Sequence, residues 1–81
     1  MKDNILGRNL TYLRKNAKFT RDKMAELLET SKFTYRKWEY GEHEPNVDTL
    51  IKLSEIFNVS IDELVGNSKD GMQLALLEEK Q

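Results

Sequence analysis

Apolar residues recur at intervals of three and four along most of the chain, which is the spacing of one face of an α-helix. No segment alternates apolar and polar residues for long, so the pattern predicts helices and no β-strands. We expect five short helices between about residues 3 and 66, each delimited by capping residues. The fold class that follows is all-α, a compact five-helix bundle.

Capping residues delimit the first three helices. Asp3, Thr20 and Ser31 are typical N-cap residues, and each precedes a helical apolar pattern. Gly41 follows the third pattern, where glycine commonly ends a helix. The first helix places four apolar side chains on one face: Leu6, Leu10, Leu13 and Ala17. The next two contribute Met24, Ala25, Leu27 and Leu28, and then Tyr35 and Trp38, an apolar pair that we expect to point inward.

Two more helices and a polar linker follow. Asn46 begins a helix whose apolar residues again repeat at three and four: Val47, Leu50, Leu53, Ile56 and Phe57. Ser60 and Glu63 form a capping box for a short helix in which Leu64 and Val65 pack and which Gly66 ends. We therefore predict one domain over residues 1–66 and a tail over residues 67–81. Residues 72–79 suit an additional helix that packs on the domain or on a dimer partner, and the alternative is a frayed end.

The composition excludes several classes of protein. The chain has 81 residues and no cysteine, so it has no disulfide, thiolate metal site or thiol nucleophile. His43 has no partners at metal-ligand spacing, and we expect no metal, no cofactor and no enzymatic activity. The mean hydropathy of −0.69 and the lack of a long apolar run argue against a membrane span. With no visible signal peptide, we expect a cytoplasmic protein.

The net charge of −1 conceals an uneven distribution along the chain. Residues 1–40 carry ten basic and five acidic side chains, whereas residues 41–81 carry three basic and nine acidic ones. A polyanion would therefore bind the first half, and the acidic second half is the better surface for a protein partner.

Residues 20–39 predict a helix-turn-helix. A helix of about nine residues is followed by a break of three and then by another helix, which forces a steep crossing. In this arrangement the second helix is presented to DNA. Opposite its inward apolar pair, this helix carries three cations and two aromatic residues and no acid: Lys32, Phe33, Arg36, Lys37 and Tyr40. Such a face suits a negatively charged groove.

In the order and spacing of its motifs, the chain resembles the lambda-repressor-like (Cro/C1-type, XRE-type) helix-turn-helix domains. The matching pieces are LGRNL with Leu13-Arg14, Phe19-Thr20, Met24-Ala25, Ser31, WEYG with Pro45, LIKL and VSIDEL. They extend over residues 6–66, roughly three quarters of the chain. The resemblance implies a transcriptional regulator that binds double-stranded DNA as a homodimer, with the third helix in the major groove.

The resemblance also implies roles for single residues. Lys32, Phe33 and Lys37 occupy the positions that usually touch base edges. Phosphate or flanking contacts are implied for Ser31 or Thr34, for Arg36, and at the start of the second helix for Thr20 and Arg21. Arg14 and Glu39 correspond to a structural ion pair. The role of Tyr40, either packing or flanking a phosphate contact, stays open.

The chain departs from the family pattern at two single positions and in one loop. Arg21 replaces a common glutamine, and Glu29 replaces a glycine in the turn, which is unfavourable if the turn is left-handed. The loop Glu42-His43-Glu44 is acidic where the family is often basic, so it should repel phosphate or meet a protein.

Simpler interpretations remain for the same residues. The cations of the third helix could be an ordinary solvated face, and Phe33 could be partly buried in the core. Two alternative functions also remain: a protein-interaction module of the same fold, such as an antirepressor, and the DNA-binding half of a toxin–antitoxin pair. Repression would follow from occluding polymerase, and activation from contacting it through the acidic half. The sequence does not choose between the two, and a repressor is our expectation.

Overall fold

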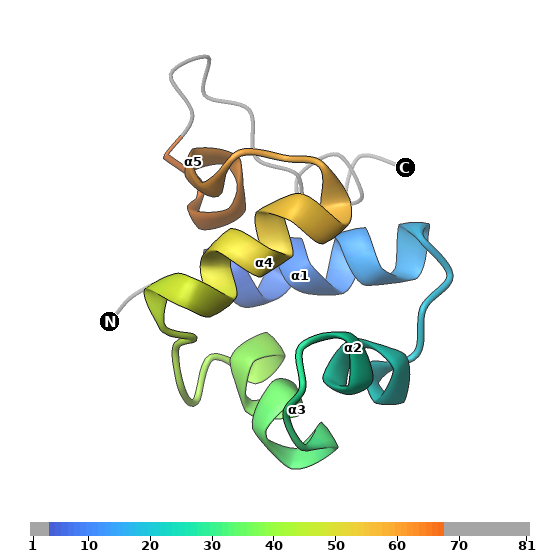
Figure 1. The fold of residues 1–81 in the computed structure, drawn as a ribbon. Helices are drawn as coiled ribbons and strands as arrows, with labels where there is room; N and C mark the ends of the chain where they lie inside the picture. The colour runs from blue at the N-terminus through green and yellow to red at the C-terminus, as the bar shows by residue number, and fades with distance from the viewer. Residues whose placement is uncertain (1–3, 68–81) are drawn as a thin grey trace.

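The computed structural model describes residues 4–67, which form five α-helices and no strand. They are α1 (Ile5–Asn16), α2 (Arg21–Leu27), α3 (Lys32–Tyr40), α4 (Val47–Phe57) and α5 (Ile61–Val65). The predicted all-α five-helix bundle is confirmed. In Figure 1, α1 crosses the middle of the molecule behind α4, α2 and α3 lie below it, and α5 lies above. The predicted additional helix over residues 72–79 lies outside the described residues.

Polar side chains cap the helices where the sequence predicts them, with one exception. At the start of α2 to α5, the N-cap side chain accepts a hydrogen bond from a backbone N–H in the first turn, 2.9–3.0 Å away. These N-caps are Thr20, Ser31, Asn46 and Ser60. The capping box of Ser60 and Glu63 is complete. Because these bonds satisfy donors that have no partner within the helix, short helices can begin at fixed positions.

The N-cap of α1 is Asn4, and the prediction of Asp3 is wrong by one residue. Asn4 Oδ1 accepts the Gly7 N–H at 3.2 Å, and Asn4 Nδ2 donates to the Glu39 carbonyl at 2.8 Å. A carboxylate has no N–H to donate, so only the asparagine can cap α1 and also join it to the end of α3. The approach is close, because a Cβ on Gly7 would lie 2.2 Å from the Glu39 carbonyl oxygen.

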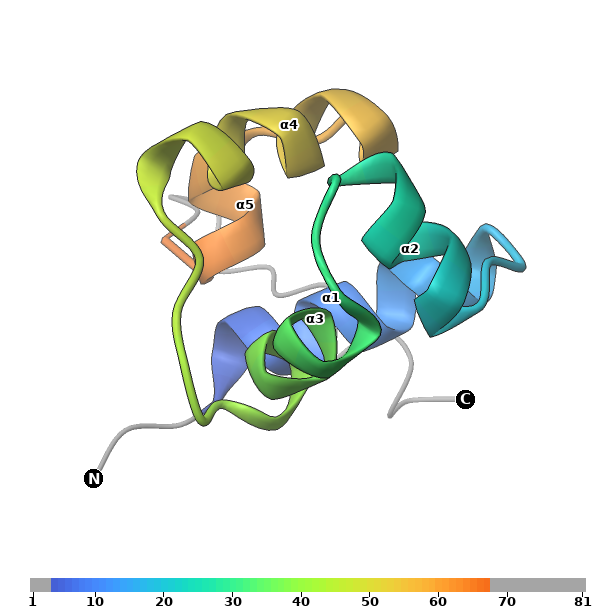
Figure 2. The ribbon, with the colours of Figure 1, turned by 60° about the horizontal axis from the view of Figure 1, so that its bottom comes forward.

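The core contains one completely buried hydrophobic residue from each helix. These residues are Leu10, Met24, Tyr35, Leu53 and Leu64. Helices α1 and α3 pack against each other, as do α2 and α3, and α1 and α5. Viewed from below, α3 lies in front of α1 and next to α2 (Figure 2). The core therefore holds α3 by its inner side and leaves its outer side exposed.

Four residues predicted on apolar faces are exposed, among them Leu27, which is 38% exposed at the last position of α2. Ala17 is wrongly placed on the buried face because α1 ends at Asn16, and the chain turns away at Lys18, where φ is 64°. Val47 is 67% exposed at the first position of α4, and Val65 is 38% exposed at the last position of α5. Each of these residues continues the apolar spacing of its helix but lies at or just beyond the end of that helix, where the core does not cover it.

The turn between α2 and α3 is left-handed at Glu29, where φ is 57°. A side chain destabilises this conformation by about 1–2 kcal/mol relative to glycine. We therefore expect Glu29→Gly to raise the free energy of unfolding by about 1 kcal/mol, part of the gain being offset by the greater freedom of the unfolded chain. The urea midpoint measures this change. The matched variant Glu26→Gly, within α2, should lower the free energy of unfolding by about 1 kcal/mol. A Glu29→Gly protein that is less stable than wild type would show that the backbone at Glu29 is not strained.

Candidate nucleic-acid interface

Helix α3 divides its side chains between the core and the surface as the sequence predicts. Tyr35 and Trp38 are buried, with ring centroids 6.0 Å apart and an interplanar angle of 78°. On the opposite side, four predicted contact residues are exposed: Lys32, Phe33, Arg36 and Tyr40. A fifth, Lys37, is half-buried. Phe33 is 67% exposed, so it does not belong to the core.

Cations and aromatic rings alternate on this surface. The Arg36 guanidinium carbon lies 5.3 Å from the Tyr40 ring centroid and 5.8 Å from that of Phe33. Arg21 approaches the Tyr40 ring at 5.5 Å, and Lys37 Nζ approaches the Phe33 ring at 5.8 Å. We call these five residues the cation–aromatic row. Because each ring attracts two cations, the row restrains the long basic side chains before any ligand binds.

A groove of about 700 Å³ lies between the start of α2 and the first turns of α3. Its lining contains four cations, two aromatic rings, Thr20 and one acid: Arg14, Phe19, Thr20, Arg21, Asp22, Lys32, Phe33 and Arg36. Asp22 Oδ1 lies 3.4 Å from Lys32 Nζ, with both side chains largely exposed. Asp22 was not among the predicted site residues, although its place in the first turn of α2, facing the start of α3, could have indicated it.

Hydroxyl groups lie at the N-termini of both helices of the motif. The Thr20 hydroxyl accepts the Lys23 N–H at 3.0 Å, and the Ser31 hydroxyl accepts the Thr34 N–H at 3.0 Å. Ser31 also donates to the Thr34 hydroxyl at 3.0 Å, so the two alternative contact residues are joined to each other. Thr20 and Ser31 are exposed and Thr34 is half-buried.

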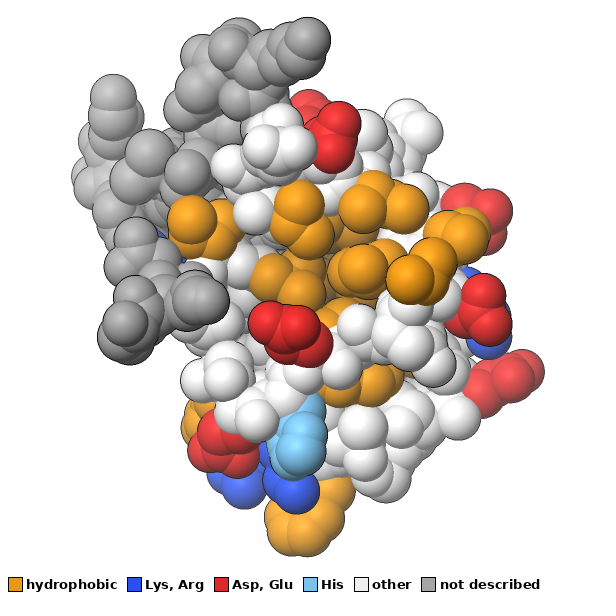
Figure 3. Space-filling view, turned by 90° about the vertical axis from the view of Figure 1, so that its left-hand side faces the viewer, with side chains coloured by type: hydrophobic (Ala, Val, Ile, Leu, Met, Phe, Trp, Pro, Cys, Tyr) orange, Lys and Arg blue, Asp and Glu red, His pale blue; other side chains and the backbone are white. Residues whose placement is uncertain are grey.

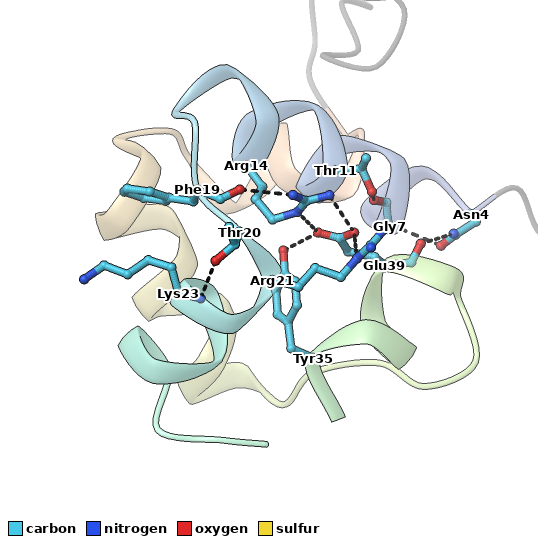
Figure 4. A network of polar contacts seen from close by, with 10 residues as sticks. All are labelled: Asn4, Gly7, Thr11, Arg14, Phe19, Thr20, Arg21, Lys23, Tyr35 and Glu39. Carbon is cyan, nitrogen blue, oxygen red and sulfur yellow. Dashed lines mark hydrogen bonds and ion pairs between the residues drawn. The ribbon is translucent and has the colours of Figure 1, made fainter. Parts of the chain in front are cut away.

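The buried Glu39 carboxylate connects three elements beneath this surface (Figure 4). Arg14 Nε donates to Glu39 Oε2 at 2.7 Å, which is the ion pair that the family resemblance implies. Tyr35 Oη donates to the same oxygen at 2.5 Å. Arg21 Nε donates to Glu39 Oε1 at 2.9 Å. Arg14 reaches further and donates to the Phe19 carbonyl at 3.1 Å.

Arg21 is thus a second cation of the Glu39 cluster, which the sequence analysis did not predict. The signal was present, because Glu39 is the only acidic residue of α3 and Arg21 begins the neighbouring helix. The Arg21 side chain is 35% exposed. It can therefore hold Glu39 and still present a donor to the solvent.

The cluster shifts the titration of its members in opposite directions. Burial by itself would raise the pKa of Glu39, but hydrogen bonds from Arg14, Tyr35 and Arg21 outweigh it, so the pKa is lowered. Burial raises the pKa of Tyr35 far above its usual range, and the neighbouring Glu39 carboxylate raises it further. Glu39 is therefore an anion and Tyr35 a neutral donor near neutral pH.

The acidic loop after α3 is exposed throughout Glu42, His43 and Glu44. It follows Gly41, which ends α3 with φ of 79°. Within residues 4–67, no group of three or more His, Cys, Asp or Glu side chains could hold a metal ion. In the same part of the chain, no helix has the length and apolar character needed to cross a membrane.

Comparison with known proteins identifies the family. A model of the helix-turn-helix family matches residues 10–64, more than half of the chain. The chain belongs to the Cro/C1-type helix-turn-helix family. This match contains the whole of α2 and α3, and with them the cation–aromatic row.

The relatives are transcriptional regulators. The chain is 36% identical over 64 residues to the HTH-type transcriptional regulator ImmR of Bacillus subtilis. These residues cover 79% of this chain and 50% of ImmR. It is 38% identical over 53 residues to the cryptic phage CTXphi transcriptional repressor RstR of Vibrio cholerae. These residues cover 65% of this chain and 47% of RstR. The chain thus spans about half the length of these relatives.

A solved structure of a transcriptional regulator has the same fold. The crystal structure of a transcriptional regulator from Listeria innocua superposes with a TM-score of 0.75 and 33% sequence identity. The match covers 93% of this chain and 71% of that one.

Proposed function

We propose that this protein is a transcriptional regulator that binds duplex DNA sequence-specifically through the outer face of α3. The observation that carries the proposal is the cation–aromatic row, with Lys32 beside it. Except for Arg21, which begins α2, these side chains belong to α3, the helix that a helix-turn-helix inserts into the major groove, and most of them are exposed. No acidic residue of α3 lies on this face, because Glu39 is buried.

The contacts divide into two kinds. Lys32, Phe33 and Lys37 would face base edges, where lysine donates to guanine O6 and N7. Arg36, Arg21 and the hydroxyls of Thr20, Ser31 and Thr34 would contact phosphate or flanking groups, which fix the position of the protein without reading the sequence. Tyr40 would hold the two arginines of the second kind in place, since both approach its ring.

A homodimer would be formed through α4 and α5. These helices leave four apolar side chains at least one third exposed: Val47, Ile51, Ile61 and Val65. Within each helix the two are four residues apart and so share a face. Apolar side chains gather on the side of the molecule shown in Figure 3, whereas α3 lies at the bottom of Figure 1. A two-fold axis along that side would direct both α3 helices to one DNA duplex.

Repression is the mode of regulation that we propose, because a dimer seated on a promoter blocks polymerase. RstR, one of the relatives, is named a repressor. The exposed acids of the loop after α3 favour a second candidate, a protein-interaction module of the same fold. In that case the acidic surface would bind a partner and the α3 face would be dispensable.

The dependence of DNA affinity on salt concentration tests the DNA-binding proposal. If a dimer neutralises four to eight phosphates, log K should fall with log salt with a slope of about −4 to −7. The measurement is a fluorescence-anisotropy titration of a labelled duplex at several potassium chloride concentrations. Binding that is absent, or that does not change with salt, would contradict the proposal.

A further inference from the structure

Phe33 differs from its neighbours on the outer face of α3. Its ring is 67% exposed, and it has no atom that can donate or accept a hydrogen bond. It is the second residue of α3, near the N-terminus that a helix-turn-helix directs at base edges. Burying such a ring against a polar base edge would remove water from the base without replacing its hydrogen bonds.

The ring is held in place before DNA binds. Arg36 and Lys37 follow Phe33 by three and four residues, which makes both of them its neighbours on the helix surface. Their cationic groups lie 5.8 Å from the ring centroid. Because the ring is already restrained, little side-chain entropy would be lost when its exposed edge meets a partner.

We propose that Phe33 recognises the 5-methyl group of a pyrimidine in the major groove, and that this contact sets part of the sequence specificity. The inference rests on the proposed function and makes it more specific. Among the four ordinary bases, only thymine presents an apolar group on this edge, its 5-methyl group. A 5-methylcytosine would present the same group. Since Lys32 and Lys37 flank the ring along α3, the methyl group would lie next to the bases that these lysines read.

The test uses a duplex that the wild-type protein selects from a random pool. Each thymine is replaced by uracil in turn, which removes the methyl group and changes nothing else on the base edge. We expect one position per half-site where the replacement lowers affinity about fourfold, the effect of one methyl group. At that position cytosine should bind more weakly than thymine, and 5-methylcytosine should bind more tightly than cytosine.

Variants of the protein assign the effect to Phe33. Phe33→Ala should lower the affinity for the thymine duplex and abolish the difference between thymine and uracil, whereas Phe33→Leu should keep that difference. Tyr40→Ala is the matched control, because it removes the other exposed ring of the same face. It should lower affinity for both duplexes by the same factor.

The outcomes separate this inference from the proposed function. If wild-type protein binds the selected duplex but does not distinguish thymine from uracil at any position, the inference is wrong and DNA binding stands. The same holds if Phe33→Ala keeps the distinction. If no duplex is selected at all, the proposed function fails and the inference fails with it.

Discussion

Replacing both Lys32 and Lys37 by glutamate should lower the affinity for a specific duplex about a thousandfold. Each replacement would remove a base contact that contributes about 1–3 kcal/mol to the binding free energy, and each new carboxylate would face a negatively charged groove. Both side chains lie on the outer side of α3, away from the buried Tyr35 and Trp38. The fold should therefore survive, which circular dichroism would show, and anisotropy titration gives the affinity.

The control for this double variant changes the net charge by the same amount at two positions outside α3. Lys15, in the last turn of α1, and Lys52, in α4, are exposed and lie outside the α2–α3 groove. Lys15→Glu with Lys52→Glu should therefore weaken binding far less and leave the preferred sequence unchanged. If the α3 variant binds DNA as well as this control does, the α3 face is dispensable and the interaction-module function replaces the DNA-binding one.

Removing the Glu39 carboxylate should be the most destabilising single change among the polar residues that we describe. Glu39→Ala leaves Arg14 buried without its anion and removes the acceptor of Tyr35. Breaking a buried ion pair in this way costs about 3–5 kcal/mol, which is a large fraction of the stability of a domain of this size. Urea unfolding measures the loss. Arg21→Ala is the control, and it should cost about 1 kcal/mol, because its side chain is 35% exposed and Arg14 still pairs with Glu39.

The pH dependence of stability tests the same cluster. Because the folded-state pKa of Glu39 is lowered, its contribution is fully present above the unfolded-state pKa and is lost as pH falls through the folded-state value. Wild-type protein should therefore lose more stability below about pH 4 than Glu39→Gln, which does not titrate there. Equal acid sensitivity of the two proteins would show that Glu39 does not hold the cluster as an anion.

The helices and most of their boundaries could be predicted because they depend on local chemistry. N-caps, the capping box and the glycines after α3 and α5 act within a few residues, so the sequence contains the whole signal. The N-cap of α1 was displaced by one residue for the opposite reason. Asn4 is selected by a hydrogen bond to the Glu39 carbonyl, 35 positions along the chain.

The division of α3 into an exposed and a buried face could be predicted from the sequence, but the contacts of α3 with other helices could not. The spacing on α3 separates outward cations from inward rings, and this required only helical periodicity. The bonds of Arg21 to Glu39 and of Lys32 to Asp22 join different helices, so they depend on how α2 crosses α3. Glu29 shows the same limit. The sequence shows that a left-handed conformation would be unfavourable at this residue, but only the structure shows that Glu29 adopts it.

If two copies of α3 read one specific duplex, selection from a random pool of duplexes should recover a common sequence. The recovered sequences should share a near-palindrome whose half-site centres are about 34 Å apart, one turn of DNA. Guanines and a thymine should recur within each half-site, as Lys32, Lys37 and Phe33 require. Recovery of no common sequence, or of one whose enrichment persists with the Lys32→Glu, Lys37→Glu protein, would contradict the account.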